Sequence, residues 1–340
     1  MALLPRAEGT DRRGNLLTVV VEAQKLQKMY NGFEAVAGID FHIHRGECFG
    51  ILGPNGAGKT TVVAMIYCFN PISGGKLTVL GNDVTANTRA IKTRLGVVPQ
   101  ENNLDLELTV RENLLVYASY FGIRRSEAHK RVEELLHFFS LSTKADQEVD
   151  RISGGMKRRL TIARGLIHTP EILILDEPTT GLDPQSRRLI WEHLRQLKNK
   201  GLTLVLTTHY LEEASQLCDE LIIMDQGIIL EQGKPLDLIQ KQVGAKVVEV
   251  EINLEHSHAL VHTLEHLISG YQLAGNTIYL YITEDETEAV KMISSCKHVH
   301  TYRLRPSNLE DVFLKLTGRG LDYAEDTMVF TDPKKTGHIL

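Results

Sequence analysis

The feature that most constrains this chain is a glycine-rich loop at residues 53–61, with the sequence GPNGAGKTT. The apolar run CFGIL at 48–52 precedes the loop, and a second apolar run, VVAMI at 62–66, follows it. This order predicts a strand, a loop and a helix, which is the arrangement that binds a polyphosphate. We expect the glycines at 53, 56 and 58 to allow backbone conformations that a Cβ would forbid, so that several N–H groups face the phosphates.

The other residues of this loop have their own parts in the prediction. Lys59 supplies a positive charge to the β and γ phosphates, and the Thr60 hydroxyl is a ligand for Mg²⁺. Thr61 is placed to hydrogen-bond the α phosphate, and the positive end of the helix dipole adds to the same site. The loop residues expected to bind ATP are Gly53, Asn55, Gly56, Ala57, Gly58, Lys59, Thr60 and Thr61.

Polar residues follow two further apolar runs. ILIL at 172–175 leads into Asp176 and Glu177, and LTLVLTT at 202–208 leads into His209. The carboxyl ends of the strands face the ligand crevice in an open α/β sheet. We therefore expect Asp176 to hold Mg²⁺ through water and Glu177 to polarise the attacking water. His209 is placed to contact the γ phosphate and to position that water, whereas a lone histidine after a strand is more often structural.

Three weaker signals lie outside these strands. Tyr30 follows a β-prone run at 16–26, beside an Asn-Gly hairpin signal, and is placed to stack on adenine; a tyrosine that only packs in its strand is the alternative. Gln100 follows a short strand at 95–99. Ser153 and the two glycines after it precede a helical pattern, and on their own they could be a plain N-cap.

Composition excludes several classes of protein. The 340 residues are 42% hydrophobic and 24% charged, with a formal net charge of -5, so no nucleic-acid partner is expected. No apolar run approaches the roughly 18 residues of a membrane-spanning helix, and the N-terminus lacks the apolar core of a signal peptide. We expect a cytosolic chain that reaches a membrane only through a partner.

Taken together, these segments resemble the ATP-binding subunit of ABC transporters from about residue 16 to residue 244. The order and spacing of the whole series are far more specific than any one motif. In chain order the matching motifs are the A-loop aromatic Tyr30, the Walker A loop at 53–61, the Q-loop Gln100, the signature with Ser153 and Gly155, the Walker B acids Asp176 and Glu177, the D-loop with Asp183, and His209.

The resemblance implies an ATPase with two kinds of partner. Two copies would face head to tail, with each ATP between the phosphate loop of one copy and Ser153 and Gly155 of the other. ATP would close this homodimer and hydrolysis would reopen it. The motion would reach integral membrane permease subunits through the Q-loop region, and these subunits would hold the chain at the cytoplasmic face of the cell membrane. By this resemblance, the residues that bind the nucleotide are those of the loop with Tyr30, Gln100, Ser153, Gly155 and Asp183. Those that bind the metal are Thr60, Gln100 and Asp176. Glu177 would be the general base, and His209 would be the switch.

The signature also indicates a branch of the family. Met156 stands where many members carry glutamine, and Met-Lys-Arg-Arg at 156–159 with the sequence at 176–187 looks most like the drug and lipo-oligosaccharide exporters, which include the daunorubicin-resistance and nodulation exporters. The alternative, a soluble ABC ATPase of DNA repair or translation, is disfavoured. Only a short helical segment interrupts the nucleotide domain, and the chain has one such domain. A binding-only regulator has no support, because Glu177 and His209 are both present.

The expected fold is an α/β P-loop ABC domain at 16–244, with a helical subdomain at about 102–170, and a small C-terminal α+β domain at 245–318. Residues 1–15 and 319–340 are expected to be a flexible arm and a flexible tail. The C-terminal pattern reads βαββαβ, which suggests a ferredoxin-like layer for dimer contact or regulation. His258, His262 and His266 share a face of an expected helix at 258–269. We interpret this face as solvated rather than metal-binding, because it lies opposite the apolar face.

Overall fold

The computed structural model describes residues 18–282 and 286–318, so the arm expected at 1–15 and the tail expected at 319–340 lie outside the described residues. The chain divides into two compact units between Ile229 and Leu230. The domain boundary that the sequence pattern placed at 244 stays a prediction. Within the described ranges, no helix is both long enough and apolar enough to cross a membrane.

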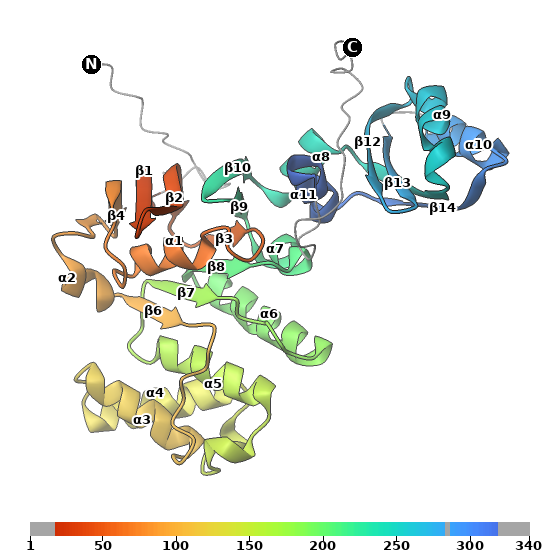
Figure 1. Cartoon of the computed structure of the whole chain (residues 1–340). Coiled ribbons are helices and arrows are strands. Elements are labelled where there is room, and N and C mark those ends of the chain that lie inside the picture. Colours follow the sequence, from red (N-terminus) through yellow and green to blue (C-terminus); the bar gives the residue numbers. More distant parts are fainter. Residues whose placement is uncertain (1–17, 283–285, 319–340) are drawn as a thin grey trace. The chain divides into compact units, whose positions relative to one another are not determined.

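A six-stranded sheet in the order β10-β9-β3-β8-β7-β6 runs through the first unit (Figure 1). Strands β3, β7 and β8 are buried along their whole length, as expected for strands covered on both faces. The neighbours of β3, β7 and β8 in this sheet pair with them in parallel, so their carboxyl ends share one edge. The bounds are β3 Cys48–Leu52, β6 Leu95–Val98, β7 Ile172–Asp176, β8 Thr203–Thr208, β9 Glu220–Asp225 and β10 Ile228–Gly233.

A second, antiparallel sheet has the order β2-β1-β4-β5. Its strands are β1 Val19–Tyr30, β2 Phe33–His44, β4 Gly74–Val79 and β5 Asn82–Asp83. The expected hairpin is present, with Asn31 and Gly32 at φ 46° and 88° in the turn. However, β1 continues past Leu26, where the apolar pattern ended. The pattern misses this stretch because the stem of Lys28 is buried while its ammonium reaches the carbonyl of Pro71.

The helical subdomain expected at about 102–170 lies beyond β6 as a separate group of helices, α3, α4 and α5 (Figure 1). A capping box starts α3: Thr109 accepts a hydrogen bond from the Glu112 backbone, and the Glu112 carboxylate accepts one from the Thr109 backbone. The helices of the first unit are α1 Lys59–Ile66, α2 Thr88–Lys92, α3 Val110–Tyr120, α4 Arg125–Phe138, α5 Gly154–Leu166, α6 Pro184–Asn199 and α7 Leu211–Leu217, with 3-10 turns at Ser142–Lys144 and Val149–Arg151.

The second unit has the expected βαββαβ order, with the antiparallel sheet order β12-β13-β11-β14 of a ferredoxin-like fold. Apolar residues of this sheet, such as Val248 and Leu280, form one core with Leu260 and Leu264 of α9 and Ile293 of α10. The elements are α8 Pro235–Gln242, β11 Lys246–Ile252, α9 Leu254–Leu264, β12 Ile268–Ala274, β13 Thr277–Ile282, α10 Glu286–Ser295, β14 Val299–Pro306 and α11 Leu309–Thr317.

The helix expected at 258–269 was placed wrongly, because α9 starts earlier and ends at Leu264. Ile268, within the range expected to be helical, is the first residue of β12 instead. His258, His262 and His266 are all exposed, and His266 lies beyond the end of the helix. No group of three metal-ligating side chains positioned to hold an ion occurs in the described ranges.

A buried ion pair fixes the start of α11, and it generates a prediction. Asp311 is 0% exposed, accepts two hydrogen bonds of 2.7 Å from Arg305, and accepts another from the backbone of Asn308. We expect Asp311→Ala to lower the free energy of unfolding of the second unit by about 3 to 5 kcal/mol, because it leaves the guanidinium and the helix cap without this carboxylate.

Calorimetry or denaturant unfolding followed by circular dichroism would measure this loss. The control is Glu286→Gln, which breaks the pair with Lys246, whose two side chains are about 40% exposed. An exposed pair of this kind contributes about 1 kcal/mol or less. Equal losses in the two variants would contradict the assignment.

Candidate active site

The phosphate loop joins β3 to α1, and its glycines serve two different purposes. Gly56 and Gly58 have φ of 83° and 99°, in the left-handed region that favours glycine. Gly53 does not adopt a left-handed φ, so glycine is required there for a reason other than a left-handed backbone. A Cβ at Gly53 would instead lie 2.2 Å from the carbonyl oxygen of Met224, which leaves no room for a side chain.

The loop is also held by backbone from two other segments. A Cβ at Gly58 would lie 2.5 Å from the carbonyl oxygen of Ala35 in β2. The Gly227 N–H, in the turn after β9, donates to the carbonyl of Ala57 at 3.1 Å, and the Ala37 N–H donates to the carbonyl of Gly227 at 2.9 Å. The shape of the loop is therefore set by β2 and by the turn between β9 and β10.

Lys59 lies between this loop and the acidic residues at the end of β7. Its ammonium is buried and donates to the carbonyls of Gly53 and Pro54, at 2.9 Å each. The same nitrogen is 3.7 Å from Oε1 of Glu177. Burial lowers the pKa of Lys59, and the negative charges of Glu177 and Asp176 oppose that shift.

Asp176 ends β7 and lies among hydroxyl groups. Its Oδ1 accepts a hydrogen bond of 3.2 Å from the Thr60 hydroxyl and a second from the hydroxyl of Thr207 in β8. Carboxylate, hydroxyl and amide oxygens are the ligands that a hard divalent cation prefers. The pairing of Thr60 with Asp176 therefore fits a Mg²⁺ site.

Glu177 is the centre of the predicted catalytic residues. It has a left-handed φ of 45°, uncommon for a residue with a side chain, and its N–H donates to the Thr207 hydroxyl at 3.0 Å. Its Oε1 is 3.1 Å from Nδ1 of His209, and its Oε2 accepts hydrogen bonds of 3.1 Å from the Gln100 amide and the Thr180 hydroxyl. Contact with His209 is the largest cause that lowers the pKa of Glu177, against the opposing effect of burial, so this carboxylate is ionised at neutral pH.

The remaining predicted residues lie outside this cluster. Ser153 caps α5 by accepting from the Met156 N–H, as the plain N-cap alternative required, and Asp183 caps α6 in the same way. The two helix starts adjoin, because a Cβ at Gly155 would lie 2.4 Å from the hydroxyl of Ser186. Tyr30 is 39% exposed, and its hydroxyl accepts a hydrogen bond of 2.6 Å from Asn70.

Several residues of the site carried no motif in the sequence. The Thr207 hydroxyl donates to Asp176, and the Thr180 hydroxyl donates to Glu177. Glu213 is fully buried and accepts hydrogen bonds from Thr179 and Trp191. Burial raises the pKa of Glu213. In the sequence, the only signal for a role of Thr180 and Thr207 is their position next to the polar ends of the strands. Arg158, in the basic run after the signature, was also missed.

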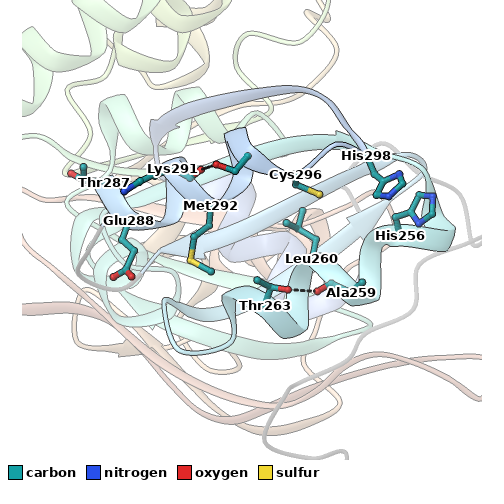
Figure 2. A pocket seen from close by; sticks show the side chains of 11 residues that line it. His256, Ala259, Leu260, Thr263, Thr287, Glu288, Lys291, Met292, Cys296 and His298 are labelled. Carbon is teal, nitrogen blue, oxygen red and sulfur yellow. Dashed lines mark hydrogen bonds between the residues drawn. The ribbon is translucent and has the colours of Figure 1, made fainter.

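A cavity of about 910 Å³ lies between α9 and α10 in the second unit (Figure 2). Leu260 and Met292 project from the two helices into its middle, and His256 and His298 lie together at one end. The rings of these two histidines stack with centroids 3.7 Å apart. None of the residues expected to bind or hydrolyse ATP lines this cavity.

Comparison with known proteins decides the family. The ABC transporter family matches residues 36–180, and the C-terminal domain of the nodulation factor export protein NodI matches residues 255–318. The Nod factor export ATP-binding protein I of Burkholderia thailandensis is 44% identical over 301 residues, 88% of this chain and 97% of that protein. The protein of the same name from Rhizobium etli is 42% identical over 322 residues, 93% of this chain and 98% of the relative.

The chain belongs to the ATP-binding proteins of ABC transporters, in the NodI branch. Both the predicted family and its exporter branch are thereby confirmed, as is the assignment of the chain as an ABC transporter ATPase. The match covers both units of the chain, including the ferredoxin-like C-terminal domain.

Solved structures agree with this assignment for the ABC domain. cbiO1 of Clostridium perfringens, described as part of the ABC transporter complex cbiONQ, is 28% identical, with a TM-score of 0.60 over 64% of this chain and 88% of that one. The ATP-binding cassette MJ0796 is 27% identical, with a TM-score of 0.57 over 63% of this chain and 98% of that one. Its structure is a dimer in a post-hydrolysis state bound to ADP and Pi.

The contact between His209 and Glu177 predicts the pH dependence of this ABC ATPase. Because His209 lowers the pKa of Glu177, the predicted general base loses its charge only at a pH below the usual range for glutamate. In His209→Ala the pKa rises, so we expect the acid limb of the profile of kcat/KM against pH to move to higher pH, in addition to any loss of rate. His137→Ala, which removes an exposed histidine from α4, should leave the limb in place. An unmoved limb in His209→Ala would show that the contact does not set the pKa of the group that limits hydrolysis.

Proposed function

We propose that this chain is the ATP-hydrolysing subunit that powers export of a lipo-oligosaccharide through a separate membrane permease. The observation that carries the proposal is the Glu177 carboxylate, held by Gln100, Thr180 and His209 beside the buried Lys59. The substrate class is inferred from the relatives, which are named for Nod factor export and span nearly the whole chain.

In the proposed mechanism, the loop at 53–61 binds the phosphates of ATP through its backbone N–H groups, and Lys59 places its charge on the β and γ phosphates. Thr60, Gln100 and Asp176 would hold Mg²⁺, which neutralises charge on the phosphates when it is bound. Tyr30 is exposed, so its ring can stack on adenine.

The hydrolytic step depends on the residues that follow β7 and β8. Glu177, already ionised, accepts the proton of the attacking water. His209 contacts the carboxylate that takes this proton and orients it toward the water. The Gln100 amide donates to the other oxygen of the same carboxylate, which connects the Q-loop to the general base.

We propose a head-to-tail homodimer as the active form. Ser153, Gly155 and Asp183 lie at the adjoining starts of α5 and α6, apart from the chain's own Glu177 cluster. They are thus placed to receive the ATP bound by a second copy. The dimer of MJ0796, bound to ADP and Pi, supports this arrangement.

A groove of the first unit is the proposed docking surface for the permease, which would hold the subunit at the cytoplasmic face of the membrane. It has a volume of about 700 Å³ and is lined by side chains of α2, β6 and α3, including Arg89, Tyr117 and Tyr120. Tyr120 is 75% exposed, a large apolar surface for a monomer to leave in water. The groove also borders β6, the strand that leads to Gln100, so a partner seated here is connected to the catalytic carboxylate.

Replacing the general base tests the hydrolytic assignment. We expect Glu177→Gln to lower kcat for ATP at least 100-fold, because the amide cannot accept the proton. The same variant should bind ATP and elute as an ATP-dependent dimer in gel filtration, since the other binding groups remain. Glu212→Gln, at an exposed position in α7, should behave as wild type. Hydrolysis at the wild-type rate in Glu177→Gln would refute the assignment.

A second substitution tests the docking groove. We expect Tyr120→Ala to weaken co-purification with the permease at least tenfold, because an exposed aromatic residue contributes strongly when a partner buries it. The ATPase activity of the isolated subunit should change less than about twofold, since Tyr120 lies at the end of α3 with its ring against Tyr117, in the helical subdomain. Leu106→Ala, at another exposed apolar position, serves as the control. Undiminished recovery of the permease with Tyr120→Ala would rule out this surface.

A further inference from the structure

Arg158 is a buried cation in the helix that starts with the signature. It lies in the second turn of α5, five residues after the N-cap Ser153, and is 4% exposed. Burial lowers its pKa to about 10, and the carboxylates of Glu213, Asp176 and Glu177 oppose the shift, so the guanidinium is charged at neutral pH. A buried charge of this kind requires compensation from its surroundings.

That compensation comes from backbone carbonyls of two catalytic segments. The Arg158 donors reach the carbonyls at distances between 2.5 and 3.2 Å. Nε donates to Pro178, Nη1 to Pro99 and Gln100, and Nη2 to Asp176 and Glu177. A guanidinium has five N–H groups in one plane, so all of its donors are used.

The five acceptors belong to the stretch after β6 and to the end of β7 with the turn after it. The first stretch carries the Gln100 amide and the second carries the Glu177 carboxylate, which hydrogen-bond each other at 3.1 Å. Arg158 fixes the backbone beneath both side chains. A lysine has three donors on a single nitrogen and cannot match five carbonyls arranged around a planar fork.

We propose that Arg158 is a positioning residue that couples the signature to hydrolysis, by tying the helix that starts at Ser153 to the backbone of Gln100 and Glu177. When the ATP bound by the second copy contacts the start of α5, any movement of α5 is then transmitted to the turn that carries Glu177. The inference rests on the proposed function, in which Ser153 receives the ATP of the second copy and Glu177 is the base.

The next residue of the same helix supplies a matched control. Arg159 is also buried, at 9% exposed, and burial lowers its pKa as well. Its guanidinium donates to the carbonyls of Phe139 and Ser140 at the end of α4, inside the helical subdomain. Arg158 and Arg159 therefore share charge, helix and burial, and differ in which backbone they hold.

The test compares Arg158→Lys, Arg158→Gln and Arg159→Lys in the full-length chain. We expect Arg158→Lys to lower kcat at least tenfold and to change KM and the Kd for a fluorescent ATP analogue by less than about threefold. Arg158→Gln should lose more turnover than Arg158→Lys, because the lysine keeps the charge and part of the hydrogen bonding. Arg159→Lys should lower the Tm by about as much as Arg158→Lys does, but it should keep kcat within about threefold of wild type.

A second measurement separates coupling from general damage. In the Glu177→Gln background, Arg158→Lys should still form the ATP-dependent dimer, because the phosphate loop and Ser153 are untouched. Normal turnover in Arg158→Lys, an equal loss of kcat in Arg159→Lys, or loss of the dimer in the double variant would each overturn the inference. The proposed function fails separately, if Glu177→Gln itself hydrolyses ATP normally.

Discussion

The parallel pairing of β8 with β3 on one side and β7 on the other is the constraint on which the site depends. Leu52 pairs with Thr208, and Asp176 pairs with Thr207, so the three strands end at the same level. The segments that follow them carry Lys59, Glu177 and His209, which are thereby brought together from distant parts of the sequence. A slip of one residue in either pairing would turn the side chains within that strand to the opposite face of the sheet and shift the segment that follows it.

Where this constraint acts, the sequence was sufficient to predict where the candidate residues lie. An apolar run marks a strand buried on both faces, and the first polar residues after it mark its carboxyl end, so Asp176, Glu177 and His209 could be placed without coordinates. Arg158 could not, because its partners are backbone carbonyls, which look the same at every residue. The roles of Thr180 and Thr207 could not be predicted for a related reason, since the role of a hydroxyl group depends on its hydrogen-bond partner in the folded chain.

Boundaries and glycines were harder to predict than the site. Leu267 and Ile268 fit the apolar period of α9 as well as that of a strand, and only the sheet decides that Ile268 belongs to β12. The polar Lys28 hid the extension of β1, because its aliphatic stem does the packing. The sequence predicted that glycine is needed at position 53, but it did not show why. The carbonyl of Met224, which leaves no room for a side chain, comes from another strand.

The same close packing around the phosphate loop has a thermodynamic consequence. With Gly53 against Met224, Gly58 against Ala35 and Ala57 bonded to Gly227, the loop is fastened by backbone that belongs to other strands. A preorganised loop loses little conformational entropy when a nucleotide enters it. Little of the free energy of ATP binding is then needed to order the loop, and most of it remains available for the dimer closure that we propose.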